Sequence, residues 1–340
     1  MRDTVVTFIV PTYNSARTLR RCLDSFLDES LFDDMDVLII NDGSTDESAS
    51  LAMEYVSKYR IFQLISKENG GHGSVINYGS SIARGKYFKV IDSDDWVQTG
   101  NLPLYIESLR NSTADVVLTN FRTIDSRNNY IREYAMSGLE FGRVYSFDAL
   151  WQRKKAVSKV LAFHGITYRT GFYQSCGICL SEGISYEDQE YATLPFASVG
   201  TVLPVDVFLY EYSLGDPCQS VSDQNQVKQF EQMLHVFWRV ADFTPANILP
   251  TASEYFHYKK CGMLLSCYMA ALVKNPCKAK GRSRIKQLRK QLKEQSPILH
   301  SATRRQYATC LLLSYLRFNG DTLVKLQKMP TYRFFAARMH

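Results

Sequence analysis

Short runs of β-branched and aromatic residues alternate with segments of helical periodicity in the N-terminal third of the chain. The runs occur at residues 5–10, 37–40, 61–65 and 87–91, and each stops at a proline or a polar turn, as buried strands do. Between them, apolar residues recur three and four positions apart, which is typical of a helix with one buried face. This alternation predicts an α/β fold, in which helices cover both faces of a mostly parallel, Rossmann-like sheet.

The pattern changes after Ser222, where apolar residues follow helical spacing only. We therefore predict two domains, an α/β domain over residues 1–222 and a helical domain over residues 223–340. In the first domain a fifth strand is expected at 116–118, followed by loops and short strands. In the second, helices are expected at 230–240, 255–273, 285–292 and 307–318.

The composition is that of a globular protein, with 45% hydrophobic and 22% charged residues. The chain starts without an apolar leader and contains no run of 18 apolar residues, so we expect neither export nor a membrane span. A cytoplasmic location follows, and there the eight cysteines are expected to be reduced. Cys176 and Cys179 form a C-x-x-C motif without the second pair that a zinc site needs.

Positive charge gathers in the helical domain. The net charge is +6, and residues 274–305 contain eleven Lys or Arg and one acid, Glu294. This excess predicts an anionic partner for that domain, and an anionic membrane surface fits, with Phe334 and Phe335 as apolar anchors. A solvated basic face or a homo-oligomer contact are alternatives. We expect no nucleic-acid partner.

Three carboxylates directly follow the predicted strand at 87–91, namely Asp92, Asp94 and Asp95. Like charges at one strand end repel each other, and a divalent cation with oxygen ligands would offset the repulsion. The alternative is an acidic turn that caps the next helix. Turns 11–14 and 41–46 also follow strands, and ligands of open α/β sheets bind at that edge. We therefore expect the three turns to be neighbours.

Two common nucleotide motifs are missing from the sequence. The first strand-to-helix turn, residues 11–14, has no glycine, and the G-x-G-x-x-G pattern that starts at Gly71 fails at Ile76. The P-loop pattern G-x-x-x-x-G-K-[ST] does not occur. What remains is a nucleotide held by side chains and a metal held by carboxylates.

Four segments, taken in order, resemble the motifs of family 2 glycosyltransferases of GT-A fold: residues 10–14, 41–46, 69–71 and 92–95. The resemblance covers about residues 4–222. It implies a metal-dependent inverting enzyme that moves a hexose-type sugar from a nucleotide sugar to a glycan or lipid-linked acceptor. A UDP-sugar donor and a place in cell-surface polysaccharide synthesis are the implied details.

The resemblance also assigns roles to residues. Asp92 would contact the ribose or a bridging water, and Asp94 would coordinate Mn²⁺ or Mg²⁺ on the diphosphate. Asp95 would support the metal or a sugar hydroxyl. The nucleotide would further be held by Pro11, Tyr13, Asn14, Asp42, Gly70, Gly71 and Ser93.

The acceptor side rests on a second acidic pair, Glu187 and Asp188, of which Asp188 would be the general base. His164 would line the acceptor pocket, and Gln219 and Ser220 would donate hydrogen bonds to the diphosphate. Purely structural roles remain possible for three of the candidate site residues. Asp42 could simply form a turn, Asp188 could belong to an acidic helix start, and His164 could pack in the core. His72 receives no role.

Two rival functions remain. A phosphoryl- or nucleotidyl-transferring enzyme could also use Asp92 and Asp94 on a metal, but no phosphate-cradling loop follows the first strand. A non-catalytic member of the family could serve as a scaffold in a polysaccharide assembly complex. Two intact acidic clusters argue against a scaffold, which needs neither.

Overall fold

The computed structural model describes residues 4–125, 130–215, 219, 222–245, 248–320 and 322. The chain divides into two compact units. The first contains Met1–Gly215 and Thr244–Tyr255, and the second contains Asp216–Phe243 and Phe256–His340. The domain boundary near Ser222 stays a prediction.

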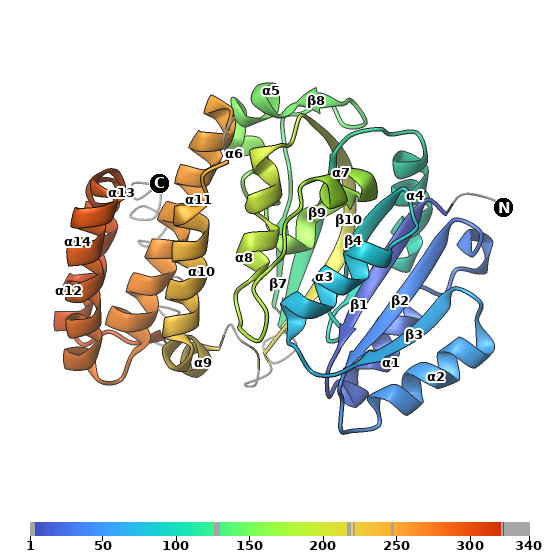
Figure 1. Ribbon diagram of the computed structural model, residues 1–340, viewed down its shortest axis with the longest axis horizontal. Coiled ribbons are helices and arrows are strands. Elements are labelled where there is room, and N and C mark those ends of the chain that lie inside the picture. Colours follow the sequence, from blue (N-terminus) through green and yellow to red (C-terminus); the bar gives the residue numbers. More distant parts are fainter. Residues whose placement is uncertain are drawn as a thin grey trace. The chain divides into compact units, whose positions relative to one another are not determined.

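The first unit is built on one ten-stranded sheet (Figure 1). Its main path runs β3 (Phe62–Lys67), β2 (Met35–Asp42), β1 (Val6–Thr12), β4 (Tyr87–Val90), β9 (Ile166–Arg169), β6 (Val116–Asp125), β10 (Thr201–Leu214) and β5 (Trp96–Val97). Two strands lie off this path, β7 (Tyr130–Tyr134) beside β6 and β8 (Tyr145–Ser146) beside β10. The predicted strands are all present, within one or two residues at their starts.

The sheet has two parallel parts joined by an antiparallel strand. In one part β1 runs parallel to β2 and β4, and β2 runs parallel to β3. In the other part β6 runs parallel to β10. The short strand β9 lies between β4 and β6 and is antiparallel to both. The mostly parallel GT-A arrangement is thus confirmed, whereas β9 was not predicted.

Helices flank this sheet because their apolar stripes need cover. On α1, Leu19, Cys22 and Leu23 are fully buried, as their spacing predicts. Every residue of β1 is buried as well. The helices of this unit are α1 (Ala16–Asp24), α2 (Ser48–Lys58), α3 (His72–Ile82), α4 (Leu102–Arg110), α5 (Phe147–Trp151), α6 (Lys154–Val157), α7 (Thr170–Ser175) and α8 (Asp188–Tyr191).

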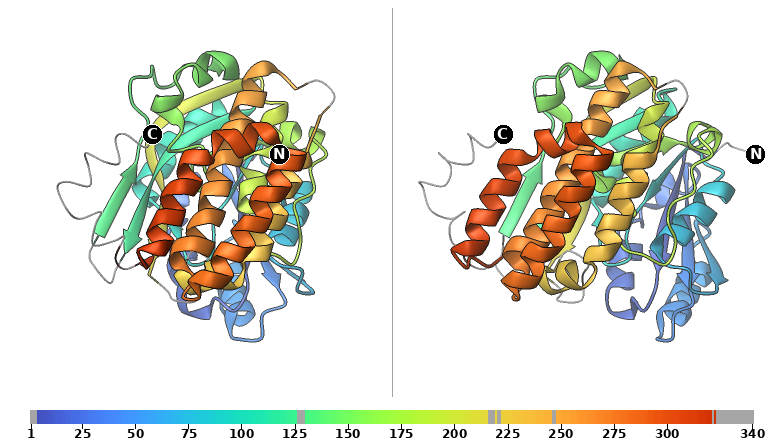
Figure 2. Two further views of the ribbon diagram at one scale, coloured as in Figure 1. Left: turned by 90° about the vertical axis from the view of Figure 1, so that its left-hand side faces the viewer. Right: turned by 60° about the vertical axis from the view of Figure 1, so that its left-hand side comes forward.

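The second unit is helical, with its later helices lying alongside one another (Figure 2). Arg289 is buried there and donates to the Tyr268 hydroxyl at 3.2 Å and to Thr303 Oγ1 at 3.1 Å. In the described part of the chain, no helix is both long and apolar enough to span a bilayer. The helices are α9 (Asp223–Lys228), α10 (Phe230–Asp242), α11 (Pro250–Tyr268, its start in the first unit), α12 (Lys278–Gln295), α13 (Pro297–Ala302) and α14 (Arg304–Tyr315).

Candidate functional site

The first two turns at the carboxyl edge of the sheet are tied together by Asn14. Its backbone has a φ of +49°, and its Oδ1 accepts from the N–H groups of Thr45 at 2.8 Å and Asp46 at 3.3 Å. These bonds make one platform of the turns after β1 and β2. On it, Tyr13 is 53% exposed, so its ring is open to a ligand, whereas Pro11 is buried within β1.

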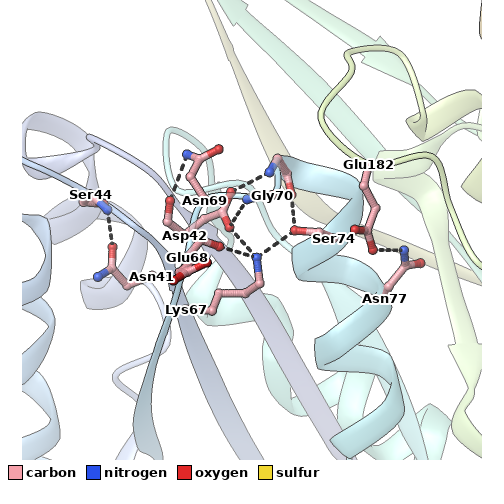
Figure 3. Close-up of polar contacts among 11 residues, drawn as sticks. Asn41, Asp42, Ser44, Lys67, Glu68, Asn69, Gly70, Ser74, Asn77 and Glu182 are labelled. Atoms are coloured by element: carbon pink, nitrogen blue, oxygen red, sulfur yellow. Dashed lines mark hydrogen bonds and ion pairs between the residues drawn. The ribbon is translucent and has the colours of Figure 1, made fainter.

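Asp42 connects the second turn to the glycine loop (Figure 3). Its Oδ1 accepts from Lys67 Nζ at 2.7 Å and from the Gly70 N–H at 3.0 Å, and its Oδ2 accepts from the Gly71 N–H at 2.8 Å. The Lys67 ammonium also donates to Ser74 Oγ at 2.9 Å. Because all these partners are at least 25 positions away, Asp42 does more than form its own turn.

The glycines of the loop allow a second segment to approach closely. Gly71 has a φ of +83°, and a Cβ on Gly73 would lie 2.1 Å from the carbonyl oxygen of Ser181. The Gly183 N–H donates to the Gly70 carbonyl at 2.7 Å. The start of α3 is therefore packed against the segment that leads to the second acidic pair.

His72, the first residue of α3, joins the two acidic clusters. Its Nδ1 lies 2.6 Å from Glu187 Oε1, and its Nε2 lies 2.9 Å from Asp92 Oδ1. Burial lowers the pKa of His72, but the two carboxylates outweigh it and hold the pKa well above the ordinary 6.5. In return, although burial opposes it, the charge of His72 lowers the pKa of Asp92. The two carboxylates, one at each ring nitrogen, thus favour the protonated form of the ring.

The first acidic cluster has the donor atoms of a divalent-cation site. Ligand oxygens of Asp92, Asp94 and Asp95 all lie within 4.8 Å of one another. Asp95 is fully buried and accepts from the Tyr210 hydroxyl at 2.6 Å and from the Ser213 N–H at 2.7 Å. Burial, then the charges of Asp94 and Asp92, raise the pKa of Asp95 well above its usual value. A hard cation with oxygen ligands would relieve this concentration of negative charge.

The second acidic cluster opens α8. Tyr186, just before it, has a φ of +75°, a conformation rare for a non-glycine residue. Glu187 is buried, whereas Asp188 is half-buried at the start of the helix. The Glu187 carboxylate contacts His72 Nδ1 at 2.6 Å, whereas Asp188 Oδ2 accepts from Gln189 Nε2 at 3.0 Å.

Tyr212 on β10 lies beside both clusters. Burial raises the pKa of its hydroxyl, and the negative charges of Asp95, Asp92, Asp188 and Asp94 raise it further. The Tyr212 hydroxyl thus lies in the field of both clusters, which His72 joins by direct contacts. That is the arrangement a reaction between a metal-held donor and a base-activated acceptor requires.

His164 forms a wall of this place. Its ring stacks on Tyr212 with centroids 4.3 Å apart, and it lies 5.1 Å from the ring of Phe121. Burial lowers the pKa of His164 to about 4, so the ring is neutral at pH 7. His164 is half-buried and beside the acids, rather than sealed in the core.

The other predicted residues have different surroundings. The Ser93 hydroxyl is buried and bonded to Ser15 Oγ at 2.7 Å. Gln219 belongs to the second unit, where its carbonyl accepts from Ser222, and Ser220 lies outside the described residues. The roles given to Gln219 and Ser220 stay predictions. Away from the site, Cys176 and Cys179 are reduced, and the Cys179 sulfur accepts from the Asn77 amide at 3.3 Å.

Several residues of the site were not predicted from the sequence. His72 and Lys67 are the main ones, because their partners are far away in the sequence. Arg21 is another, and its guanidinium donates to the Asp94 carbonyl at 2.6 Å while stacking over Trp96. A signal existed only for His72, which directly follows a Gly-Gly pair at a helix start.

The curated proteins that resemble this chain include glycosyltransferases and polysaccharide synthases. The chain is 28% identical to the putative glycosyltransferase EpsH of Bacillus subtilis over 265 residues, which is 73% of this chain and 71% of that protein. It is 33% identical to the chondroitin synthase of Escherichia coli over 132 residues, but these are 38% of this chain and 19% of that protein.

Solved structures show the same fold. S. aureus TarS 1–349 in complex with UDP-GlcNAc matches with a TM-score of 0.55 at 16% identity, covering 91% of this chain and 80% of that one. Mannosyltransferase PcManGT from Pyrobaculum calidifontis, in complex with GDP-Man and Mn²⁺, matches with a TM-score of 0.52 at 16% identity, covering 92% and 86%. The model of the family described as "Glycosyl transferase family 2" matches residues 7–176. Since this match spans half of the chain, the protein belongs to glycosyl transferase family 2.

Proposed function

We propose that the protein is an inverting glycosyltransferase that moves a sugar from a nucleotide sugar to a glycan or lipid-linked acceptor in polysaccharide synthesis. The observation that carries this proposal is the convergence of two acidic clusters at His72, whose ring nitrogens lie 2.9 Å from Asp92 and 2.6 Å from Glu187. One cluster has the oxygen donors for a diphosphate-bound cation, and the other offers a carboxylate for the acceptor. A scaffold has no need of this convergence.

In the proposed reaction, Asp188 accepts the proton of the acceptor hydroxyl. That oxygen then forms a bond to the anomeric carbon, on the face opposite the diphosphate. The bond between the anomeric carbon and the diphosphate oxygen breaks, and its electron pair leaves with the nucleoside diphosphate. A single displacement of this kind inverts the anomeric configuration.

Asp94 would hold a divalent cation, Mn²⁺ or Mg²⁺, with support from Asp92 and Asp95. When bound, such a cation neutralises the charge that develops on the departing diphosphate. Asp95 is buried and bonded to Tyr210 and Ser213, so its role is to hold the acidic cluster in place from its buried side. The half-buried Asp92 and Asp94 are the residues within reach of a ligand.

For the donor we propose a UDP-sugar. The exposed Tyr13 ring would pack on the uracil, and the platform held by Asn14 and Asp42 would surround its edge. UDP-GlcNAc occupies one structural neighbour and GDP-Man another, so GDP-sugars are the alternative to test. Gly70 and Gly71 already direct their N–H groups to Asp42, which pre-forms this wall of the site.

The second unit, we propose, attaches to an anionic membrane surface that carries the acceptor. Exposed lysines lie on α12, and exposed apolar side chains lie on α13, on α14 and at the residue that follows α14. The lysines are Lys280, Lys286, Lys290 and Lys293, and the apolar side chains are Ile298, Leu312, Tyr315 and Leu316. Positive charge beside exposed apolar groups is the combination that binds anionic lipid.

A panel of nucleotide sugars, scored by thermal shift with and without Mn²⁺, tests the donor and the metal together. We expect one UDP-sugar to raise the melting temperature in a Mn²⁺-dependent way, and Asp94→Ala to abolish the shift. Asp188→Asn should keep the shift and lose sugar transfer. If no nucleotide sugar shifts the melting temperature, the scaffold becomes the better explanation.

A further inference from the structure

The ring of His72 spans the distance between the donor side and the acceptor side of the site. Its two nitrogens lie 2.9 Å from Asp92 and 2.6 Å from Glu187, and the Glu187 side chain is only 4% exposed. Both nitrogens are thus engaged by carboxylates. An imidazole ring has no internal torsion, so these two bonds set the separation of the two carboxylates.

Other contacts join α3 to the start of the segment 180–190. The Asn77 amide donates to the Leu180 carbonyl at 3.0 Å, and its Oδ1 accepts from the Leu180 N–H at 2.8 Å. Glu190, fully buried, closes the segment by accepting from the Ser181 N–H at 2.8 Å and from its hydroxyl at 2.6 Å. The position of α3 therefore determines where this segment delivers Glu187.

Asp188 is the residue next to Glu187, and it starts a helix only four residues long. The carbonyls of Glu187 and Asp188 accept from the N–H groups of Tyr191 at 3.0 Å and Ala192 at 2.9 Å, so the two residues belong to the same turn. The Asp188 carboxylate also accepts from Gln189 Nε2 at 3.0 Å, within that turn. A shift of Glu187 therefore carries Asp188 with it. A general base must lie within hydrogen-bond reach of the acceptor hydroxyl, and a displacement of about 1 Å can lower the rate about 100-fold.

We propose that His72 is a positioning residue for glycosyl transfer: by holding Glu187 against Asp92, it sets the distance between the base Asp188 and the donor bound at the first acidic cluster. This inference rests on the proposed function. His72 does not touch substrate in this role, because both of its nitrogens are committed to the carboxylates.

Two conservative substitutions separate the two contacts. The amide nitrogen of asparagine falls near the position of Nδ1, so His72→Asn can keep the bond to Glu187. The longer glutamine reaches towards the position of Nε2, so His72→Gln can keep the bond to Asp92. His72→Ala removes both contacts.

The measured reaction is the release of UDP from UDP-GlcNAc, or from whichever nucleotide sugar binds, with water as the acceptor. We expect His72→Ala to lower kcat about 100-fold, with the donor Kd changed less than about threefold. His72→Asn, which keeps only the bond to Glu187, should recover part of kcat, and His72→Gln, which keeps only the bond to Asp92, should recover none. Unchanged kcat in His72→Ala overturns the proposal. So does recovery by His72→Gln alone, because His72 would then act through Asp92 on the donor.

Amide hydrogen exchange gives a readout that needs no activity. Exchange over residues 181–191 should become faster in His72→Ala and return towards the wild-type rate in His72→Asn. Unchanged exchange in His72→Ala overturns the positioning role. Glu187→Gln, which keeps an acceptor for Nδ1, provides a second variant should His72→Ala fold poorly, and its exchange should resemble that of the wild type.

Asp188→Asn distinguishes the two levels of the proposal. If Asp188→Asn abolishes UDP release and His72→Ala does not, the proposed function stands and the positioning role fails. If the wild-type protein releases no UDP from any nucleotide sugar, the proposed function fails. The exchange measurement then still decides whether His72 holds the segment.

Discussion

Lys89 lies in β4, shortly before Asp92 in the sequence, and its side chain has no exposed surface. Its ammonium donates to the carbonyls of His164 at 2.8 Å and Ile166 at 3.1 Å. Burial lowers the pKa of Lys89 to about 7, since the charged form loses its hydration. This side chain anchors the start of β9 and the wall that contains His164.

The titration of Lys89 gives a prediction for stability. Its pKa is about 7 in the folded protein and about 10.4 in an unfolded chain, so between these values the unfolded state binds more protons. The contribution of Lys89 to the free energy of unfolding therefore rises with pH from about 7 to about 10. We expect Lys89→Met to remove this rise in urea unfolding experiments at several pH values. Lys86→Met, at an exposed position nearby, should keep the wild-type profile. Parallel profiles for wild type and Lys89→Met would contradict the assignment.

The ion pair between Asp42 and Lys67 gives a second prediction. Asp42 is almost fully buried and accepts three hydrogen bonds, so Asp42→Ala leaves Lys67 and two backbone N–H groups without their acceptor. We expect a loss of about 3 kcal/mol in the free energy of unfolding. The control Asp33→Ala breaks an exposed pair with Arg60 and should cost less than about 1 kcal/mol. If chemical denaturation gave the same loss of unfolding free energy for Asp42→Ala and Asp33→Ala, the buried pair would contribute no more to stability than the exposed one.

At the level of single residues, sequence motifs predicted the carboxylates but not their partners. Asp42, Asp92 and Asp188 stand at recognisable places, just after strands or within an acidic pair. The partner of an acid is set by the folded chain, and His72 meets an acid 20 residues away and another 115 residues away. A local sequence pattern cannot predict a contact between residues so far apart in the chain.

Among the elements, α3 is the one on which the site depends most directly. Its glycines bring it against residues 181–183, and a Cβ at Gly73 would clash with the backbone of Ser181. The two segments can stay in register only if position 73 has no side chain. The start of α3 therefore contacts both the glycine loop of the nucleotide platform and the segment that leads to Glu187 and Asp188.

Substitution of Gly73 tests this link. We expect Gly73→Ala to lower the free energy of unfolding by about 1–3 kcal/mol, because the helix must move away from Ser181. Hydrogen exchange over residues 181–191 should rise as well. Gly171→Ala on α7 is the matched control, since nothing lies within 4 Å of its added Cβ. A Gly73→Ala protein as stable as the control would refute the close-packing argument.

The elements that were predicted well are those with a strong local pattern. The β-branched runs predicted β1 to β4, and apolar stripes predicted α10 and α14 to within a few residues. The strand β9 was missed because it is four residues long and takes its place only from pairing with β4 and β6. The π-helical turn Met269–Lys274, predicted as ordinary helix, differs only in its hydrogen bonding.

At the scale of the whole molecule, the chemistry and the positive charge lie in different units. The acidic clusters belong to the first unit, and the exposed lysines of α12 belong to the second. The uneven charge was visible in the sequence, but only the structure shows which basic residues are exposed. Arg289, for example, is buried and bonded to Tyr268, so it is unavailable to a partner.

Liposome flotation tests the membrane proposal. We expect the protein to float with vesicles that contain phosphatidylserine and not with neutral vesicles. The double substitution Lys286→Gln and Lys290→Gln should weaken this binding about tenfold or more, because each lysine near an anionic surface contributes about 1 kcal/mol. Lys154→Gln with Lys155→Gln, in the first unit, should not. Equal flotation of the two double variants would rule out α12 as the contact.

The place of β9 also has a consequence for how the chain is made. The strands β4 and β6 leave the ribosome long before Ile166–Arg169, the segment that hydrogen-bonds to both. Until then each presents an unpaired edge, and such edges promote aggregation. Nascent chains that stop before residue 166 should need chaperones, whereas chains that include β9 can join β4 to β6. Pauses in translation are therefore tolerated after β9 better than before it.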